Sequence, residues 1–153
     1  MKWLELKVPP VLLLALLAAG MYGLARVLPA WTFAVPARAV AGVALAGLGG
    51  AVGLAGVVAF RRSRTTVNPH TPGKASSVVT RGVYRWTRNP MYLGLLLALG
   101  GWAVFLANAA ALAGLPAFVA SMNRFQIGPE ERILSAKFGA PYASYLRQVR
   151  RWF

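Results

Sequence analysis

Hydrophobic positions in this chain gather into four long runs, separated by two short breaks and by one long polar loop between the second and third runs. The first run is about 20 residues long, which is enough to cross a bilayer as a helix. The fourth would extend only about 21 Å as a helix, against a hydrocarbon core of about 30 Å. The third and fourth are therefore expected to form a tight hairpin that is tilted or stops short of the far surface. The pattern predicts an all-α polytopic membrane protein with about four transmembrane helices, over residues 8–28, 35–60, 91–107 and 109–122.

The first run also has features of a secretory signal peptide. Lys2 and Lys7 precede it, leucines fill it, and small residues occur at Ala18-Ala19-Gly20. The residues after this run are again of membrane type and include no polar mature domain, so we expect a retained helix.

Glycines are frequent in the second run, where Gly49 and Gly53 have GxxxG spacing. Small residues let helices approach closely in lipid. A dimer contact is one interpretation, but we expect these glycines to pack inside the monomer. Gly100-Gly101 and Gly114 would allow similar contacts in the third and fourth runs.

Basic residues outnumber acidic residues by 17 to 3, and the net charge is +14. Such a charge raises the question of nucleic-acid binding. Here the arginines flank the apolar runs, as the positive-inside rule describes, and suit contact with anionic lipid headgroups. The loop 61–88 and the tail after Arg124 are both rich in arginine. We therefore expect the lipid bilayer and no nucleic acid as partner, with that loop and both termini on the cytoplasmic side of a bacterial inner membrane.

Composition also excludes several kinds of site. Hydrophobic residues make up 58% and charged residues 13% of the chain, whereas a soluble domain carries about 25% charged residues. Because there is no cysteine, disulfides, thiolate metal sites and a cysteine nucleophile are excluded. The one histidine, His70, cannot form a zinc or bis-histidine haem site alone. We expect no metal centre.

The most polar-patterned stretch is residues 80–94, TRGVYRWTRNPMYLG, where a basic loop runs into the third apolar run. Asn89 and Pro90 suit the N-cap and the first position of a helix. A helix start also offers free N–H groups to a carboxylate. The sequence leaves both interpretations of the Asn-Pro step open.

The second informative cluster is Glu130-Glu131, which holds two of the three acidic residues. Pro129 is expected to begin a helix here, and acids in a first turn suit the helix dipole. Their scarcity in so basic a chain favours a functional role instead, in pairing with arginines or in binding an ammonium group or ribose hydroxyls. We expect this cluster to meet residues 80–94 in space and to hold a small polar cofactor at the membrane surface.

The tail beyond Gly139 is expected to form a second short helix that begins at Pro141. Its apolar and aromatic residues recur at helical spacing, which is typical of an amphipathic helix lying along the membrane interface. These residues are Tyr142, Tyr145, Leu146, Val149 and Trp152.

The motifs together resemble the signature of the isoprenylcysteine carboxyl methyltransferase family, whose wider superfamily includes phospholipid N-methyltransferases. The resemblance covers residues 68–153 and rests on the order and spacing of several short motifs. These are Val78-Val79-Thr80-x-Gly82-x-Tyr84-Arg85, Arg88-Asn89-Pro90-x-Tyr92-x-Gly94, Glu130-Glu131-x-x-Leu134, Phe138-Gly139-x-x-Tyr142-x-x-Tyr145 and Arg151-Trp152.

The resemblance implies an integral membrane methyltransferase that uses S-adenosylmethionine and releases S-adenosylhomocysteine. The implied acceptor is lipophilic or membrane-associated, such as an isoprenylcysteine carboxylate-like group or a phospholipid. The regions 68–94 and 124–153 would bind the cofactor, and Arg151, Glu130 and Glu131 would be the catalytic residues. The implied cofactor-binding residues are Gly82, Tyr84, Arg88, Asn89, Pro90, Tyr92, Gly94, Glu130 and Glu131.

Position 89 departs from the family, which often has histidine there. Asparagine still donates and accepts hydrogen bonds but cannot act as a titrating base.

Two other functions stay open on the sequence alone. A membrane reductase with a nicotinamide cofactor would belong to the same superfamily, although the chain has no glycine-rich dinucleotide fingerprint. A non-enzymatic helical scaffold would explain the apolar runs but would leave the Glu130-Glu131 pair without a purpose.

Overall fold

The computed structural model describes residues 5–63 and 77–153 and is all-α, as predicted. No β-strand occurs in these two ranges. In chain order the elements are α1 (Pro10–Val27), η2 (Pro29–Trp31), α2 (Arg38–Arg62), η4 (Gly82–Arg85), α3 (Pro90–Leu106), η5 (Ala111–Ala113), α4 (Gly114–Met122), the π-helical turn η6 (Asn123–Ile127), α5 (Gly128–Phe138) and α6 (Ala140–Gln148).

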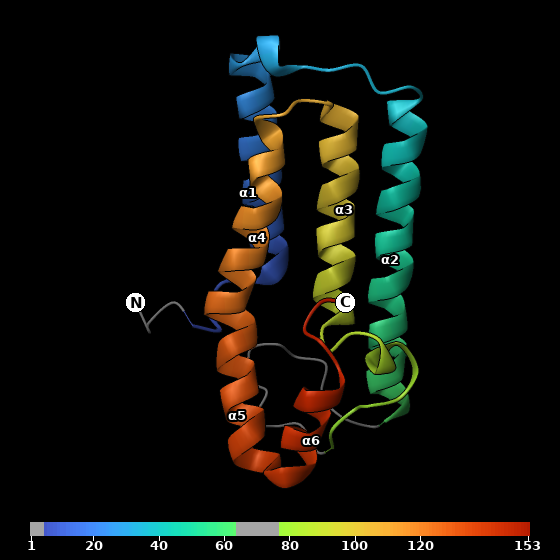
Figure 1. Cartoon of the computed structure of the whole chain (residues 1–153), viewed down its shortest axis with the longest axis vertical. Helices are drawn as coiled ribbons and strands as arrows, with labels where there is room; N and C mark the ends of the chain where they lie inside the picture. Colours follow the sequence, from blue (N-terminus) through green and yellow to red (C-terminus); the bar gives the residue numbers. More distant parts are fainter. Residues whose placement is uncertain (1–4, 64–76) are drawn as a thin grey trace.

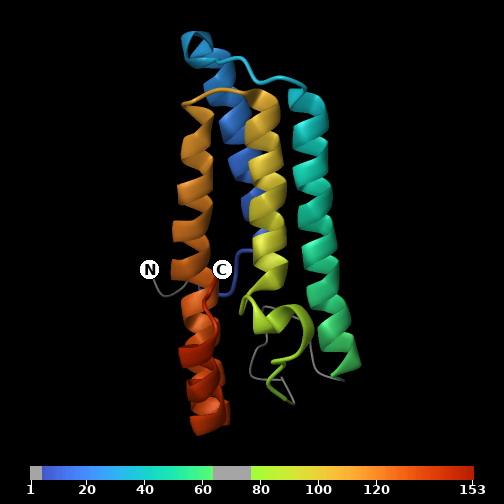
Figure 2. The same ribbon diagram turned by 45° about the vertical axis from the view of Figure 1, so that its right-hand side comes forward.

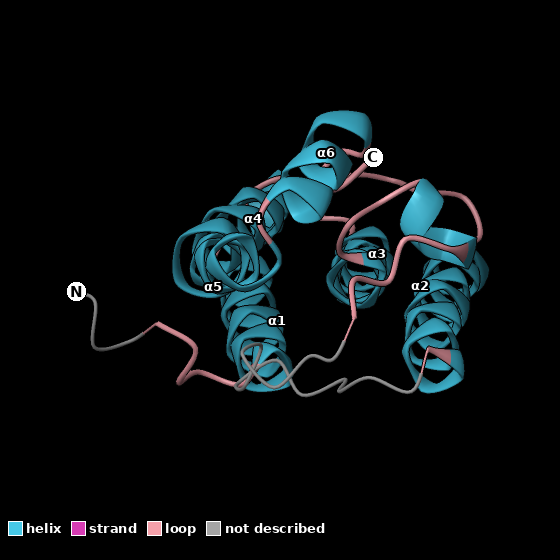
Figure 3. Cartoon of the chain, turned by 90° about the horizontal axis from the view of Figure 1, so that it is seen from below, coloured by secondary structure: helices cyan, strands magenta, loops and turns pink. Residues whose placement is uncertain are grey.

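The long helices run antiparallel to their sequence neighbours (Figure 1). Helices α1, α3 and α4 pack around a core that contains Met21, Leu99, Phe118 and Met122. Seen from the end that carries α5 and α6, α3 lies between α2 and the pair formed by α1 and α4 (Figure 3). The end of α2, the η4 turn, the start of α3 and the whole tail therefore gather at one end of the bundle.

Glycines set the contact between α2 and α3. Gly42, Gly49 and Gly56 recur every seven residues and form the buried positions of α2. A Cβ at Gly42 would lie 2.7 Å from the carbonyl oxygen of Gly101, and one at Gly94 would lie 2.5 Å from that of Gly49. The prediction that these glycines pack within the chain is confirmed.

Two helices, α1 and α2, have the length and apolarity of a membrane span. Helix α3 is apolar but has 17 residues. The predicted runs 8–28, 35–60 and 91–107 therefore match helices to within a few residues. The run 109–122 differs, because it contains the short turn η5 and then only nine residues of α4.

Helix α4 does not end at Met122 but continues through η6 into α5 as one column (Figure 2). The prediction that a helix begins at Pro129 is confirmed to within one residue, since α5 begins at Gly128 and has Glu130 and Glu131 in its first turn. The residues before Pro129 also keep helical dihedral angles, so α5 continues the helical path of α4 and η6. Proline has no N–H to donate to the carbonyl four residues earlier, which here belongs to Phe125. The N–H of Leu6 donates to that carbonyl instead, at 2.9 Å.

The segment before α1 is thereby attached to the α4–α5 column. Glu5 forms ion pairs with Arg124, at 3.2 Å, and with Arg132. The backbone of Leu6 has a positive φ of 60°, a conformation that non-glycine residues seldom adopt. We call residues 5–8 the N-terminal strap.

Candidate functional site

The two clusters singled out in the sequence meet at the end of the bundle that carries η4, α5 and α6. The start of α3 supplies one wall, α5 supplies the opposite wall, and α6 closes the side. Between them lies a cavity of about 80 Å³. Six of the predicted site residues line this cavity, namely Tyr84, Arg88, Asn89, Tyr92, Glu130 and Glu131.

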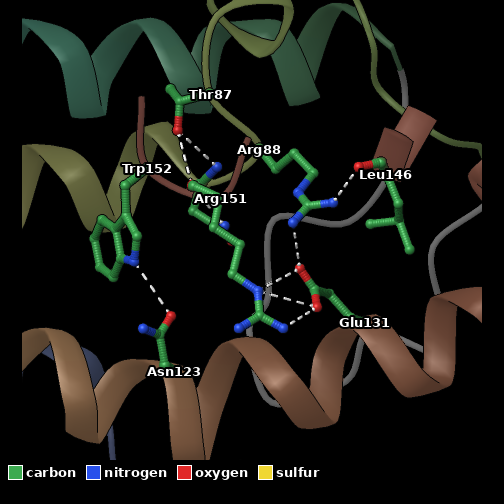
Figure 4. A network of polar contacts seen from close by, with 8 residues as sticks. Thr87, Arg88, Asn123, Glu131, Leu146, Arg151 and Trp152 are labelled. Atoms are coloured by element: carbon green, nitrogen blue, oxygen red, sulfur yellow. Dashed lines mark hydrogen bonds and ion pairs between the residues drawn. The ribbon is translucent and has the colours of Figure 1, made fainter. Parts of the chain in front are cut away.

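Glu131 is the charged centre of the site (Figure 4). Its carboxylate accepts hydrogen bonds from Nε and Nη2 of Arg151, at 3.0 and 2.6 Å, and pairs with Nη2 of Arg88 at 3.1 Å. The side chains of Arg88 and Glu131 are 13% and 15% exposed, whereas that of Arg151 is 40% exposed. The hydrogen bonds to Glu131 raise the pKa of the Arg151 guanidinium. Arg151 is thus the solvent-facing member of a three-residue cluster.

The tail positions these groups through its main chain. Arg88 donates from Nη1 to the carbonyl of Leu146 at 3.0 Å and from its N–H to the carbonyl of Arg150 at 2.9 Å. The carbonyl of Arg151 accepts from the hydroxyl of Thr87, at 3.0 Å, and from Nδ2 of Asn89, at 2.9 Å. Residues 146–151 are therefore held against residues 87–89 by four hydrogen bonds.

This arrangement corrects one interpretation of the Asn-Pro step. Helix α3 does begin at Pro90, and Asn89 occupies the N-cap position. However, the Asn89 side chain makes no capping bond among the described residues. Its Nδ2 donates to the carbonyl of Arg151. The N–H groups at the start of α3 stay candidates for binding a carboxylate, as predicted.

Glu130 lies in a different environment from its neighbour. The hydroxyl of Tyr92 donates to its carboxylate, at 3.1 Å to the nearer oxygen. Burial raises the pKa of the Glu130 carboxyl to about 8; the hydrogen bond from Tyr92 opposes this rise and the charge of Glu131 adds to it. The site combines an arginine-paired carboxylate with a carboxyl group that titrates close to neutrality.

Aromatic rings complete the walls of the cavity, and a hydrogen bond from a tyrosine hydroxyl to a backbone carbonyl supports them. The ring of Tyr84 meets that of Phe60 edge-on, with centroids 5.2 Å apart. The hydroxyl of Tyr145 donates to the carbonyl of Tyr84 at 2.8 Å. Burial raises the pKa of Tyr84, Tyr142 and Tyr145, so these phenols stay neutral.

The remaining predicted residues lie outside the cavity lining. Gly94 packs on α2 at Gly49, and Pro90 is buried at the start of α3 beside Gly56. Gly82 has a φ of +62° and lines grooves beside η4 instead. Arg151 is connected to the cavity by its hydrogen bonds to the carboxylate of Glu131, which lines it. Residues 68–76 of the predicted binding region, including His70, lie outside the described residues.

Sequence reasoning missed part of the lining. Phe60 comes from the end of α2, and Met91, Leu134 and Tyr142 complete the set. Tyr142 was assigned to amphipathic packing, because its spacing suits a surface helix. Phe60 had no local signal, since its role depends on the contact between α2 and η4.

The donor set suits S-adenosylmethionine, which carries a sulfonium, an ammonium and a carboxylate group. Carboxyl groups and aromatic faces attract cations, and the cavity has both. In addition, Nε of Arg88 is buried without a hydrogen-bond partner among the described residues. A volume of 80 Å³ equals roughly three liquid waters, so only part of the cofactor would fit before the walls separate.

Comparison with known proteins gives a family match over most of this region. The model of the family described as Phospholipid methyltransferase matches residues 37–141. A stretch of 62 residues, 40% of the chain, is 47% identical to 98% of an uncharacterized protein of Haemophilus influenzae. No solved structure matches the chain.

Proposed function

This chain belongs to the phospholipid methyltransferase family, and we propose that it is an integral membrane enzyme that methylates a lipophilic acceptor. The methyl donor is S-adenosylmethionine and the product S-adenosylhomocysteine. The observation that carries the proposal is the meeting of Glu130 and Glu131 with the start of α3 around one aromatic-lined cavity. The acceptor is an isoprenylcysteine carboxylate-like group, a phospholipid or a similar molecule.

When bound, the cofactor supplies a methyl group that is already electrophilic on its sulfonium. Glu130 and Glu131 are placed to bind its ammonium group or ribose hydroxyls. The N–H groups at the start of α3 suit its carboxylate. The aromatic rings of Tyr84 and Tyr142 suit the sulfonium.

The residues of the site have little covalent chemistry to perform, since alignment of the acceptor and exclusion of water account for most of such a reaction. An amine acceptor must also lose a proton. Glu130 is suited to take it, because its pKa of about 8 lies close to the working pH of a general base. Arg151, the exposed member of the Glu131 cluster, is placed to orient an acidic or polar headgroup.

The membrane arrangement that we propose has four crossings. It places both termini and the loop 61–88 on the cytoplasmic side of a bacterial inner membrane. The antiparallel order of α1, α2, α3 and α4 supports this arrangement, as does the position of Arg61 and Arg62 at the site end of the bundle. An apolar cavity of about 260 Å³ between α1 and the α4–η6 column, lined partly by Leu13, Leu16 and Met122, suits the tail of an acceptor.

The test is calorimetric titration of S-adenosylhomocysteine into detergent-purified protein, beside NADPH. We expect micromolar binding of S-adenosylhomocysteine, lost in Glu131→Gln and at least tenfold weaker in Glu130→Gln. Glu5→Gln is the matched control, because it makes the same change at the only other acidic residue, which lies in the strap, and it should retain the wild-type affinity.

Two results would contradict the proposal. Binding of NADPH in place of S-adenosylhomocysteine would favour the reductase. Folded protein that binds neither compound would favour the scaffold.

A further inference from the structure

The acidic residues of this chain are all engaged with partners other than Arg81 and Arg85. Glu5 pairs with Arg124 and Arg132, Glu131 pairs with Arg88 and Arg151, and Glu130 accepts from Tyr92. The chain has three acidic and 17 basic residues in total. Arg81 and Arg85, at either end of η4, therefore have no acidic side chain left to pair with. Both arginines are exposed and are therefore accessible to an anion from outside the chain.

These two arginines line a groove of about 780 Å³ between η4 and α6. The facing wall carries the hydroxyl of Ser144 and the amide of Gln148, and Thr80 adds another hydroxyl. The lining contains no acidic side chain. The groove thus combines two guanidinium groups with neutral polar groups, a donor set that suits a phosphate.

The groove is distinct from the catalytic cavity. Among residues 5–63 and 77–153, none lines both. The hydrogen bond from Tyr145 to the carbonyl of Tyr84 joins a residue that lines the groove to one that lines the cavity. A ligand in the groove would leave the Glu130–Glu131 site accessible.

A second groove, of about 460 Å³, continues from the first at Arg81 and Gly82, which line both. Its other walls are largely apolar. The apolar walls come from the last turns of α2, from Val79 before η4 and from Val83 within it, and Arg62 and Ser63 add a polar edge at the end of α2. A polar groove and an apolar groove therefore meet at one arginine, which matches the shape of an amphiphile.

The η4 turn lies at the level expected for lipid headgroups. Within η4, Tyr84 packs on Phe60. Phe60 comes directly before Arg61 and Arg62, the two residues that end α2. Trp86, which comes directly after η4, is 80% exposed. Exposed tryptophan beside arginine at the end of an apolar helix is typical of a membrane interface.

We propose that the two grooves together bind one anionic phospholipid of the bilayer. Its phosphate lies between Arg81 and Arg85, and an acyl chain runs along the end of α2. This inference rests on the membrane location of the proposed function but not on methyl transfer. The ligand is a bound lipid of the surrounding leaflet and is separate from the methyl acceptor.

The test is native mass spectrometry of the detergent-purified full chain, titrated with phosphatidylglycerol and, separately, with phosphatidylcholine. We expect one tightly retained phosphatidylglycerol, with at least tenfold preference over phosphatidylcholine. Arg81→Gln/Arg85→Gln should lower that affinity at least tenfold. Arg61→Gln/Arg147→Gln removes the same charge at the same end of the bundle from residues that line neither groove, so it should change the affinity less than twofold.

Three results would overturn the inference. Equal losses in the two double variants would indicate a diffuse charge effect. Inorganic phosphate that displaces phosphatidylglycerol at equal concentration would indicate a soluble-anion site. Loss of S-adenosylhomocysteine binding in folded Arg81→Gln/Arg85→Gln protein would assign these arginines to the cofactor.

The single variants Arg81→Gln and Arg85→Gln serve if the double variant does not fold. Lipid retention is measured without cofactor, so a failure of S-adenosylhomocysteine binding in the wild type would leave this result standing.

Discussion

Gly49 and Gly50 are adjacent in α2 but face different surroundings, which makes them a matched pair for testing the helix contact. Gly49 is buried on the α3 side, whereas a Cβ at Gly50 would meet no atom within 4 Å. We therefore compare Gly49→Ala with Gly50→Ala, which add the same methyl group one residue apart.

The structure predicts opposite effects on stability. A Cβ at Gly49 would overlap the carbonyl oxygen of Gly94 and would lie 2.9 Å from the N of Ala98. These are backbone atoms, so relief requires α2 and α3 to separate. Overpacking of this kind costs about 1–3 kcal/mol. Among the described residues a Cβ at Gly50 meets no obstacle. Both variants gain the same helix propensity, up to about 1 kcal/mol, so they should differ by the cost of overpacking alone, roughly 1–3 kcal/mol.

Thermal unfolding in one detergent, followed by tryptophan fluorescence, measures the difference. For a chain of this size each kcal/mol corresponds to about 2–4 °C in Tm. We expect Gly49→Ala to unfold roughly 2–12 °C below Gly50→Ala.

Gly94→Ala extends the experiment to a residue that the family resemblance assigns to the cofactor pocket. Because Gly94 faces Gly49, Gly94→Ala should lower Tm as Gly49→Ala does. Equal Tm values for Gly49→Ala and Gly50→Ala would refute the predicted contact between α2 and α3.

Three further changes probe the site and the strap. The pKa of Glu130 rises from 4.5 to about 8 on folding, so wild-type stability should fall as pH rises between these values, by at most roughly 5 kcal/mol. The Tm of Glu130→Gln relative to wild type should therefore increase over that pH range and level off above it. A Tm difference that does not change with pH would contradict this. Glu131→Gln should lower the free energy of unfolding in urea by about 3 kcal/mol, because it leaves Arg88 without its ion-pair partner. Arg151→Gln should lower it by only about 1 kcal/mol, because the ion pair between Glu131 and Arg88 remains. Equal losses in the two variants would contradict this asymmetry. Glu5→Gln should change stability by less than about 1 kcal/mol, since its partners are exposed, yet it should speed hydrogen exchange of the Leu6 amide, and unchanged exchange would mean that the strap does not need Glu5.

The sequence predicts the long helices of this protein because their determinants are local. Apolar runs mark α1, α2 and α3, and glycine spacing indicates the close contact within the chain. The meeting of Glu130-Glu131 with residues 84–92 was also predictable, since so few acids occur in so basic a chain.

What the sequence could not show depends on partners distant along the chain. Pro129 lies in the first turn of α5 as predicted, but its sequence neighbours give no sign that the N–H of Leu6 donates to the carbonyl of Phe125. Asn89 resembles a capping residue until its amide meets the carbonyl of Arg151, 62 positions away. Gly94 belongs to a family motif, but its surroundings are set by α2.

The contacts of the tail have a consequence for the order in which the protein matures. The partners of Glu5 lie 119 and 127 positions further along the chain. Likewise, Thr87 and Asn89 can donate to the carbonyl of Arg151 only after that residue has been synthesised. The long helices can enter the membrane during synthesis while the site is still missing one of its walls. On the proposed function, the cofactor site forms only after residue 151 has been made, so a chain interrupted before that residue would lack one wall of the site.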